Sequence, residues 1–408
     1  MQFSKHNKQI VLLYASTFVG LIVGVLNSVI NTHALNPIEY GNVRFVQNII
    51  SFVSSLLLLG YFVSGSRLLA ISKNKLDSRR IRGIMCAILL AAISIVMLVM
   101  VVLYVISIIQ GTDNLKSLYL IAIPLCGNVL MLNYIETTAQ GDNHIGRIAL
   151  ARLLPSTLYC LAAYLLFYKL SLASSELMLM LFNGIAIIVL CTIIVSTKPS
   201  FKNLKKSFYI LNEENKKYGF NVYLGSLANV ATGYISGITL GMFCANNSNV
   251  GFYTLAVTIS APLAMLPSIV GTTYFKKFAS QEKIESKVLK GSIALTAASC
   301  ILYIICIKYI VAFLYNDNYT IVGEIASWLA IGTSLHGLGD MFNRFLGAHG
   351  KGKEIRNGAF MCGGVLIFGS FVFVYFMGIY GAVLTKIFGS VVYCSAMMFY
   401  YIRFIRKI

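Results

Sequence analysis

The stretch at residues 218–275, YGFNVYLGSLANVATGYISGITLGMFCANNSNVGFYTLAVTISAPLAMLPSIVGTTYF, contains no Asp, Glu, Lys or Arg. About 20 apolar residues are enough for a helix to cross the hydrocarbon core of a bilayer. This stretch is too long for one crossing, and the polar cluster Asn246–Asn249 near its middle is the natural place for a turn. The sequence therefore predicts two membrane-spanning helices that are joined at this cluster.

The rest of the 408-residue chain has the same character, with 58% hydrophobic and 12% charged residues. Soluble domains carry about 25% charged residues, and a compact core could not hide so many apolar side chains. The composition excludes a soluble enzyme, and the long apolar runs exclude a disordered scaffold. Because no strands of alternating polarity are found, the fold class is an all-α integral membrane protein.

Runs with few or no charges predict about twelve transmembrane helices. The first run follows two lysines and is longer than a signal-peptide core, so we interpret it as an uncleaved span. The predicted spans cover residues 10–31, 45–66, 83–109, 118–135, 153–168, 177–197, 220–242, 250–275, 291–307, 321–341, 357–377 and 382–402.

The positions of Lys and Arg predict the topology. With a cytoplasmic N-terminus, 28 of the 33 basic residues lie in inside segments, and this bias places both termini in the cytoplasm. The net charge of +19 is therefore a topology signal. It does not indicate nucleic-acid binding, since no soluble domain is present to carry a basic face. The outside segments hold only Arg44, Lys116, Lys169 and Lys308.

The two halves of the chain share landmarks at a fixed offset. Gly41 in "EYGNVRFV" matches Gly251 in "NVGFYTLA" at an offset of 210, and Gly141 matches Gly350 at an offset of 209. An even number of helices per half returns the chain to the cytoplasm, as a parallel repeat requires. Such repeats are typical of transporters. We predict six-helix bundles at 1–197 and 218–408, joined by a basic cytoplasmic linker at 198–217.

These landmarks resemble one known family, the bacterial polysaccharide (O-antigen type) flippases of the multidrug/oligosaccharidyl-lipid/polysaccharide exporter superfamily. The resemblance extends from near residue 31 to near residue 390, and its strength comes from the order and spacing of short motifs. The matching segments are "NTHALNPIEYGNVRFVQNIISF", "AQGDNHIGRIALARLLPS", "LNEENKKYGFNVYLGSLANVATGYI", "NVGFYTLAVTISAPLAMLPSIVGTTYFKKFA", "LYNDNY", "GLGDMFNRFLGAHGKGKEIRN" and "GIYGAVLTKIFGS".

The resemblance implies two six-helix bundles around a central cavity in the bacterial inner membrane. It implies transfer of undecaprenyl-pyrophosphate-linked oligosaccharide from the cytoplasmic to the periplasmic leaflet by alternating access. The implied partners are this lipid-linked glycan, membrane lipids, a glycan polymerase and chain-length machinery, and a monomer can enclose the pathway. Relatives often carry an acidic residue in the seventh span, whereas Gly233–Gly237 here reads Gly, Tyr, Ile, Ser, Gly. This departure argues against a coupling role for that helix.

Other function classes fit less well. A membrane enzyme of glycan assembly needs catalytic groups in a sizeable loop, but the outside loops are short. The carboxylate pairs of the inside loops, Glu213–Glu214 and Glu282/Glu285, are interpreted as solvated charges. A major facilitator transporter would carry a glycine between the arginines of the loop after the second span, and "SGSRLLAISKNKLDSRRIRG" has none. A drug exporter of the same superfamily remains the alternative. The nine Cys form no C-x-x-C pair, and we predict no metal site, cofactor or catalytic residue.

Ionisable residues inside spans are costly and are functional candidates. On the tenth span, His336, Asp340 and Arg344 are spaced i, i+4, i+8 and share one helix face. Asp340 and Arg344 are expected to pair. One interpretation is a self-neutralising pair that fixes the helix end, and the other is a polar track in which His336 or Asp340 binds a proton. Glu136 and Glu324, at helix ends, are further coupling candidates or interfacial charges.

A lipid pyrophosphate needs fixed cations, and Arg offers bidentate donors to phosphate oxygens. The candidates are Arg44, Arg67, Arg147 and Arg152, with anchoring at a headgroup boundary as the alternative for each, and Arg344 of the tenth span. Polar side chains that could contact sugars, or bond other helices instead, are Asn128, Asn133, Asn221 and Asn229.

Lys386 is the only basic residue inside the last predicted span. It lies five residues beyond Gly381, or about 7.5 Å along a helix. A lysine stem can reach that far back to the interface. The alternative is that Lys386 faces the pathway and supplies positive charge to the pyrophosphate.

Overall fold

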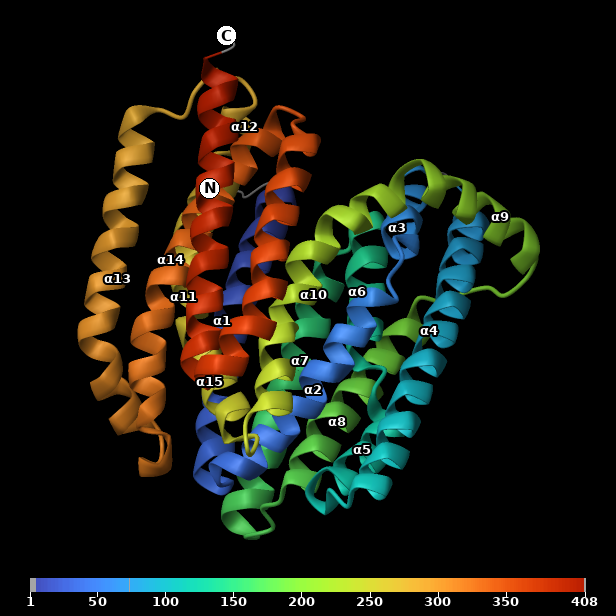
Figure 1. Cartoon of the computed structure of the whole chain (residues 1–408). Coiled ribbons are helices and arrows are strands. Elements are labelled where there is room, and N and C mark those ends of the chain that lie inside the picture. The colour runs from blue at the N-terminus through green and yellow to red at the C-terminus, as the bar shows by residue number, and fades with distance from the viewer. Residues whose placement is uncertain (1–4, 73, 407–408) are drawn as a thin grey trace. The chain divides into compact units, whose positions relative to one another are not determined.

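The computed structural model describes residues 5–72 and 74–406, without the side chains of 5–14, 113, 225–226, 228–232 and 276. The described residues form helices and no strand, which confirms the all-α class. Figure 1 shows the helices. Those of the first half are α1 (Lys5–Ala34), α2 (Pro37–Leu56), α3 (Tyr61–Ile71), α4 (Lys75–Gln110), α5 (Asp113–Leu125), α6 (Asn128–Gly141), α7 (Ile145–Tyr164), η1 (Leu165–Lys169), α8 (Ser175–Ser196), α9 (Leu204–Glu214) and η2 (Asn215–Gly219). Those of the second half are α10 (Phe220–Phe243), α11 (Ser248–Thr273), α12 (Phe275–Phe278), α13 (Ser286–Leu314), η3 (Asp317–Tyr319), α14 (Ile321–Ala348) and α15 (Gly352–Ile405).

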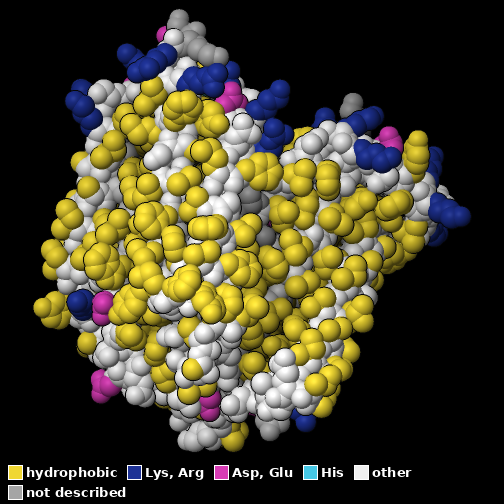
Figure 2. All heavy atoms as spheres, in the orientation of Figure 1, with side chains coloured by type: hydrophobic (Ala, Val, Ile, Leu, Met, Phe, Trp, Pro, Cys, Tyr) yellow, Lys and Arg dark blue, Asp and Glu magenta, His cyan; other side chains and the backbone are white. Residues whose placement is uncertain are grey.

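The chain is a multi-pass membrane protein. Among the residues that the structure describes, nine helices are long and apolar enough to cross a membrane, and a tenth is counted if α2 and α3 form one bent span. Figure 2 shows hydrophobic side chains over the sides of the visible face and Lys and Arg gathered at helix ends. This distribution is what a lipid-exposed surface with basic ends requires.

The predicted turn in the charge-free stretch is confirmed, because α10 ends at Phe243 and α11 begins at Ser248. The span predicted at 45–66 is not one straight helix, since it covers parts of α2 and α3, which are bent by 58° at a break between them. Leu59 (φ 45°) and Gly60 (φ 81°) adopt left-handed backbone there. A Cβ on Gly60 would lie 2.5 Å from the carbonyl carbon of Gly219, so this turn requires glycine.

The 54-residue helix α15 is two helices joined at Gly378, whose φ of 55° and ψ of −128° are not helical. The two halves run antiparallel in Figure 1. They pack closely through glycines, since a Cβ on Gly369 would lie 2.7 Å from Thr385 Oγ1 and one on Gly389 would lie 2.6 Å from Leu366 Cδ2. The break falls at the boundary that the sequence predicts between the last two spans.

The chain divides into two compact units. The N-terminal unit comprises Met1–Leu35 and Ile49–Leu224, and in it α1 packs on α7, α3 on α6, α4 on α5 and α7 on α8. The C-terminal unit comprises Asn36–Asn48 and Gly225–Ile408. Its central helix is α14, which contacts α11, α13 and α15.

The first part of α2 packs into the C-terminal unit. Asn247 Nδ2 donates to Asn42 Oδ1 over 2.8 Å, and the Tyr40 ring meets the Tyr319 ring edge-on at 6.1 Å. A Cβ on Gly41 would lie 1.8 Å from the carbonyl oxygen of Asn247, so only glycine fits. The segment 198–217, predicted as a linker, forms α9 and most of η2 and is part of the N-terminal unit.

Candidate functional site

A cavity of about 150 Å³ lies in the C-terminal unit, between α2, α10, α11 and α15. It is about two helical turns from the α10–α11 turn and from the break at Gly378. Lys386 is the one charged residue among its described lining residues. The polar residues that line it are Asn48, Tyr234, Ser236, Tyr253, Thr254, Thr258 and Lys386.

The neighbours of Lys386 in the chain fix the direction of its side chain. Thr385 packs on Gly369 in the first half of α15, and Ile387 packs on Gly332 of α14, where a Cβ would lie 3.1 Å from Ile387 Cα. Because successive residues of a helix point about 100° apart, Lys386 projects away from both contacts. Lys386 therefore lies on the face of α15 that lines the cavity.

A buried polar cluster joins α14 to α15 near Lys386. The His336 ring stacks on the Tyr393 ring at 4.5 Å. The Tyr393 hydroxyl donates to Asp340 Oδ1 over 2.9 Å and accepts from Asn343 Nδ2 over 2.7 Å. His336 Nδ1 is buried and has no hydrogen-bond partner among the described residues. Both Asp340 and His336 lie within electrostatic range of Lys386.

The expected ion pair between Asp340 and Arg344 is not formed among the described side chains. The Asp340 carboxylate accepts from Tyr393 instead, while Arg344 is exposed and packs by its aliphatic stem against Gly271. A spacing of four residues brings Asp340 and Arg344 to the same face of α14, but a residue of a neighbouring helix can be a better partner for either of them. Here α15 does so.

Arg44 lies on α2 in the C-terminal unit. Its guanidinium group lies over the Tyr40 ring at 4.9 Å, and Nη1 donates to Gln47 Oε1 over 2.9 Å. Two buried donors beside each other, Arg44 Nε and Gln47 Nε2, have no hydrogen-bond partner in the described part of the chain. Unsatisfied buried donors are costly, so this pair would favour an approaching acceptor.

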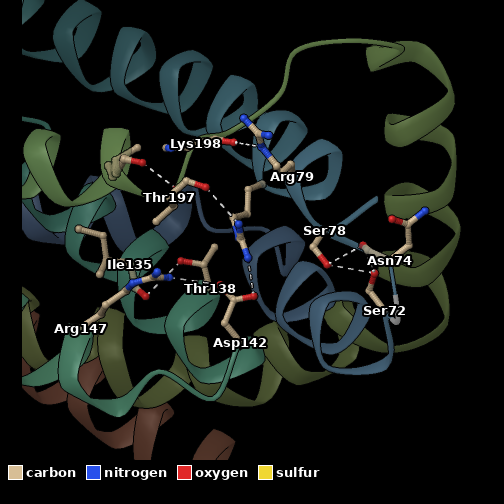
Figure 3. Close-up of polar contacts among 12 residues, drawn as sticks. Ser72, Asn74, Ser78, Arg79, Ile135, Thr138, Asp142, Arg147, Thr197 and Lys198 are labelled. Carbon is tan, nitrogen blue, oxygen red and sulfur yellow. Dashed lines mark hydrogen bonds and ion pairs between the residues drawn. The ribbon is translucent and has the colours of Figure 1, made fainter. Parts of the chain in front are cut away.

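Arg147 belongs to an ionic network at one end of the N-terminal unit. Asp142 Oδ1 accepts from Arg82 Nη2 at 2.8 Å, and Asp142 Oδ2 lies 3.5 Å from Arg147 Nη1. Arg82 also donates to the Thr197 carbonyl oxygen over 3.1 Å. Figure 3 shows Asp142 and Arg147 with Thr197 and the neighbouring bond from Arg79 to the Lys198 carbonyl. The network ties together the ends of α4, α6, α7 and α8.

Two other predicted cations are held in ion pairs. Arg67 on α3 pairs with Glu214 of α9 and lies over the Tyr218 ring at 5.0 Å. Arg152 Nε lies 2.5 Å from Glu136 Oε1, so one pair accounts for two of the predicted residues. Each of these guanidinium groups thus has a carboxylate partner within the N-terminal unit.

The remaining predicted residues have local partners or are not described. Asn128 Nδ2 donates to the buried Asn183 Oδ1 over 3.0 Å and so links α6 to α8. Glu324, in the first turn of α14, accepts from the Tyr380 hydroxyl over 3.3 Å. The side chain of Asn229 lies outside the described residues.

Loop carboxylates that an enzyme might use are engaged by lysines. Lys216 Nζ lies 3.2 Å from Glu213 Oε1, and Lys277 Nζ lies 2.7 Å from Glu285 Oε1. The hydrogen bond from Lys277 lowers the pKa of Glu285, and the same bond raises the pKa of Lys277. Within the described part of the chain, no three His, Cys, Asp or Glu residues are grouped to hold a metal ion.

Sequence reasoning missed several residues of these sites. Tyr393 joins Asp340 to His336, and Tyr253 lines the cavity, but neither carries a charge that would mark it within an apolar span. The Arg82–Asp142 pair was also missed, because its two residues lie far apart in the sequence at the ends of different predicted spans. The only sequence signal for Arg82 and Asp142 was that both are charged residues at the ends of predicted spans.

The fold is similar to those of solved membrane transporters. An inward-facing multidrug resistance MATE family transporter of the MOP superfamily matches with a TM-score of 0.70 and 14% identity over 98% of each chain. The outward-facing conformation of such a transporter matches with a TM-score of 0.61 and 16% identity, over 98% of this chain and 96% of the other. The lipid II flippase MurJ, in an inward closed conformation, matches with a TM-score of 0.67 and 13% identity, over 97% of this chain and 89% of the other.

At the level of sequence, no curated protein matches the chain. One family model, described as "Polysaccharide biosynthesis protein", matches residues 7–275. The match includes all of the N-terminal unit from residue 7 onward, and in the C-terminal unit it includes α10 and α11, which line the cavity.

Proposed function

The chain belongs to the polysaccharide biosynthesis protein family, and on this premise we propose that it is a flippase for lipid-linked glycans. The proposed substrate is an undecaprenyl-pyrophosphate-linked oligosaccharide of O-antigen or capsule type. The protein moves it from the cytoplasmic to the periplasmic leaflet of a bacterial inner membrane by alternating access. The similarity of the fold to a lipid II flippase supports a substrate of this size and chemistry.

The proposed topology has twelve membrane-spanning helices with both termini in the cytoplasm. The break at Gly378 supports the count, because a continuous 54-residue helix would be about 80 Å long, far more than a bilayer spans. Helix α10, with 24 residues, is long enough for a further crossing. The strong bias of Lys and Arg toward alternate connections supports the orientation.

Lys386 in the cavity is the observation that carries the proposal. An ammonium group binds phosphate oxygens as a point charge, and the surrounding hydroxyl and amide groups can bond sugar hydroxyls. In the proposed topology the cavity lies in the periplasmic half of the membrane. A pyrophosphate bound there has passed the bilayer midplane.

The depth of Lys386 in α15 supports the pathway interpretation over snorkelling. The helix begins at Gly378, eight residues before Lys386, so the Cα lies about 12 Å along the helix from the break. An extended lysine stem covers about half that distance, which is too short to return the charge to the interface.

The other candidate residues have different roles in the proposal. Arg44 retains a buried free donor and is the favoured second cation for the pyrophosphate. His336 and Asp340 are the proposed ion-coupling groups, because both are half-buried near Lys386. For Arg67 and Arg152 we propose a structural role, because each forms an ion pair with a glutamate.

The test combines deletion of the gene with complementation by variants. Deletion is expected to accumulate undecaprenyl-linked repeat units on the cytoplasmic side and to abolish surface glycan. Lys386→Leu should fail to restore surface glycan, with transport reduced about 10- to 100-fold because a charge-assisted bond to phosphate is lost. Lys386→Arg should keep partial activity.

The matched control is Lys308→Leu, which removes an exposed lysine from α13 of the same unit and should complement fully. Membrane levels of each variant are measured by immunoblot, so that loss of transport is separated from loss of protein. Wild-type glycan display by Lys386→Leu would rule out the cavity role. Normal glycan with altered drug tolerance in the deletion strain would instead identify a drug exporter.

A further inference from the structure

Helix α9 exposes large apolar side chains although it lies outside the apolar spans. On α9, Tyr209 is 68% exposed and Ile210 is 45% exposed, and Phe201 just before the helix is 52% exposed. An exposed cluster of this kind normally marks a surface that is covered in the working protein. We call Phe201, Phe208, Tyr209 and Ile210 the α9 apolar group.

Lysines are interleaved with the α9 apolar group. Lys202, Lys205 and Lys206 are all exposed, and none of the three forms an ion pair with an acidic side chain that the structure describes. Seen along the helix, Lys205 and Lys206 alternate with Phe208, Tyr209 and Ile210 around one exposed arc, at about 100° per residue. The surface is thus both aromatic and basic.

The opposite face of α9 is fixed to the N-terminal unit. Ser207 and Leu211 are buried, and the Tyr61 hydroxyl of α3 donates to Asn212 Oδ1 over 3.1 Å. Asn215 Nδ2, just beyond α9, donates to the Leu59 carbonyl oxygen over 3.0 Å, and Glu214 pairs with Arg67. These contacts prevent α9 from rolling its apolar group into the protein.

The depth of α9 is fixed by the loop before it. Ser200 N donates to the Arg79 carbonyl oxygen over 2.8 Å, and a Cβ on Gly83 would lie 2.0 Å from the Ser200 carbonyl oxygen. This contact lies in the first turns of α4, which are rich in Lys and Arg and begin a helix long and apolar enough to cross a membrane. In Figure 1, α9 lies at the upper end of α4. Because basic ends of spanning helices lie at the membrane surface, the exposed arc is expected at the level of the lipid headgroups.

We infer that α9 is an interfacial anchor whose exposed arc binds the anionic phospholipid headgroups of the leaflet on its own side. Aromatic side chains prefer the headgroup level of a bilayer, and lysines beside them are attracted to anionic lipids. The charge of the arc selects this occupant over a zwitterionic surface. The inference is independent of what the protein transports.

A single introduced indole can test this inference in the full-length protein. The chain has one Trp, Trp328. Trp328→Phe removes its indole fluorescence, so that the indole introduced by Tyr209→Trp gives the only signal. The protein is reconstituted in bilayers that contain brominated lipids, with or without phosphatidylglycerol. We expect strong quenching in anionic bilayers, about twofold weaker quenching in neutral ones, and a loss of the difference in 1 M salt.

Two further variants separate charge from depth. Lys202→Gln, Lys205→Gln and Lys206→Gln together should reduce quenching in anionic bilayers to the neutral level. In the control, the indole is introduced by Tyr309→Trp, at a side chain that is 77% exposed on the spanning helix α13. Its quenching should be the same in both lipids and unaffected by the lysine changes.

Three results would overturn the inference. Quenching from position 209 that is absent in anionic bilayers would place the arc in water. Quenching that is equal in both lipids and insensitive to the lysine changes would make α9 an apolar anchor without headgroup selectivity. Shielding of the indole from iodide only after cytosolic protein is added would identify a protein partner.

Discussion

At the scale of single residues, Asp142 shows how one carboxylate can organise several helix ends. Its side chain is 9% exposed and faces two guanidinium groups, of which Arg82 is 15% exposed and Arg147 is 31% exposed. Removing one partner of a buried ion pair costs more than the pair contributes, because a charge is left uncompensated. The two arginines should therefore differ in what they contribute.

We expect Asp142→Asn to lower the free energy of unfolding by about 2–4 kcal/mol, because the buried Arg82 loses its counter-charge. Arg147→Gln should cost at most about 1 kcal/mol, since its 3.5 Å contact is long and partly exposed. Thermal unfolding of the purified protein in nanodiscs measures both. The control is Arg80→Gln, which breaks the exposed Arg80–Asp77 pair and should have little effect. Equal losses for Arg147 and Asp142 would contradict this account.

Sequence reasoning could place residues on one helix face but could not name their partners. The spacing of His336 and Asp340 predicts a shared face of one helix, and both do face α15. The partner Tyr393 lies some fifty residues further along the chain. Its position depends on how two non-local helices pack, which no local pattern encodes. Polar packing between apolar helices is for this reason the least predictable part of the site.

At the scale of elements, boundaries marked by a chemical change were predictable and those marked by backbone geometry were not. The cluster Asn246–Asn249 interrupts an apolar run, so the turn between α10 and α11 is visible in the sequence. The bend between α2 and α3 lies inside a run of apolar residues at Leu56–Tyr61, where only Gly60 differs. The helix α9 was missed because its lysines mask its apolar side chains.

The break in α15 makes a prediction about one glycine. Gly378 has a φ of 55° with a ψ of −128°, a conformation that side chains with a Cβ adopt only at a cost of about 1–3 kcal/mol. We expect Gly378→Ala to lower the free energy of unfolding by that amount, although a Cβ there would meet only Cys244 Sγ at 3.7 Å. The measurement is urea unfolding in detergent micelles.

The matched control for this glycine is Gly364→Ala in the same element. Gly364 lies within the first helix of α15, and a Cβ there would meet nothing within 4 Å. Because alanine is the better helix former, this change should be neutral or slightly stabilising. If both variants behaved alike, backbone conformation at Gly378 would not be the cause.

At the scale of the whole molecule, the internal repeat and the two compact units divide the chain differently. The predicted repeat separates 1–197 from 218–408, whereas the C-terminal unit includes Asn36–Asn48. The repeat glycines themselves are in contact there, since a Cβ on Gly251 would lie 3.2 Å from Gly41 Cα. Sequence offsets predict which segments correspond, whereas packing decides which compact unit each segment joins.

The proposed topology can be checked with reporter fusions along the chain. Alkaline phosphatase fused after Gly111, which ends α4, should be active because this connection is expected outside. Fusions after Gly141 and after Arg406 should be inactive, since these sites are expected in the cytoplasm. A fluorescent protein at the same three sites should give the opposite pattern. An active phosphatase after Arg406 would reverse the orientation of the last span.

The hairpin of α15 has a consequence for how the protein is made. Its two halves are separated by a single non-helical residue, so no hydrophilic loop has to be carried across the bilayer between them. The halves can leave the insertion machinery together, already packed through Gly369 and Gly389. A lysine at the centre of an isolated helix opposes insertion by about 2.5–3.5 kcal/mol. If each half crosses the membrane as proposed, we expect the strongly apolar first half to assist the insertion of the half that contains Lys386.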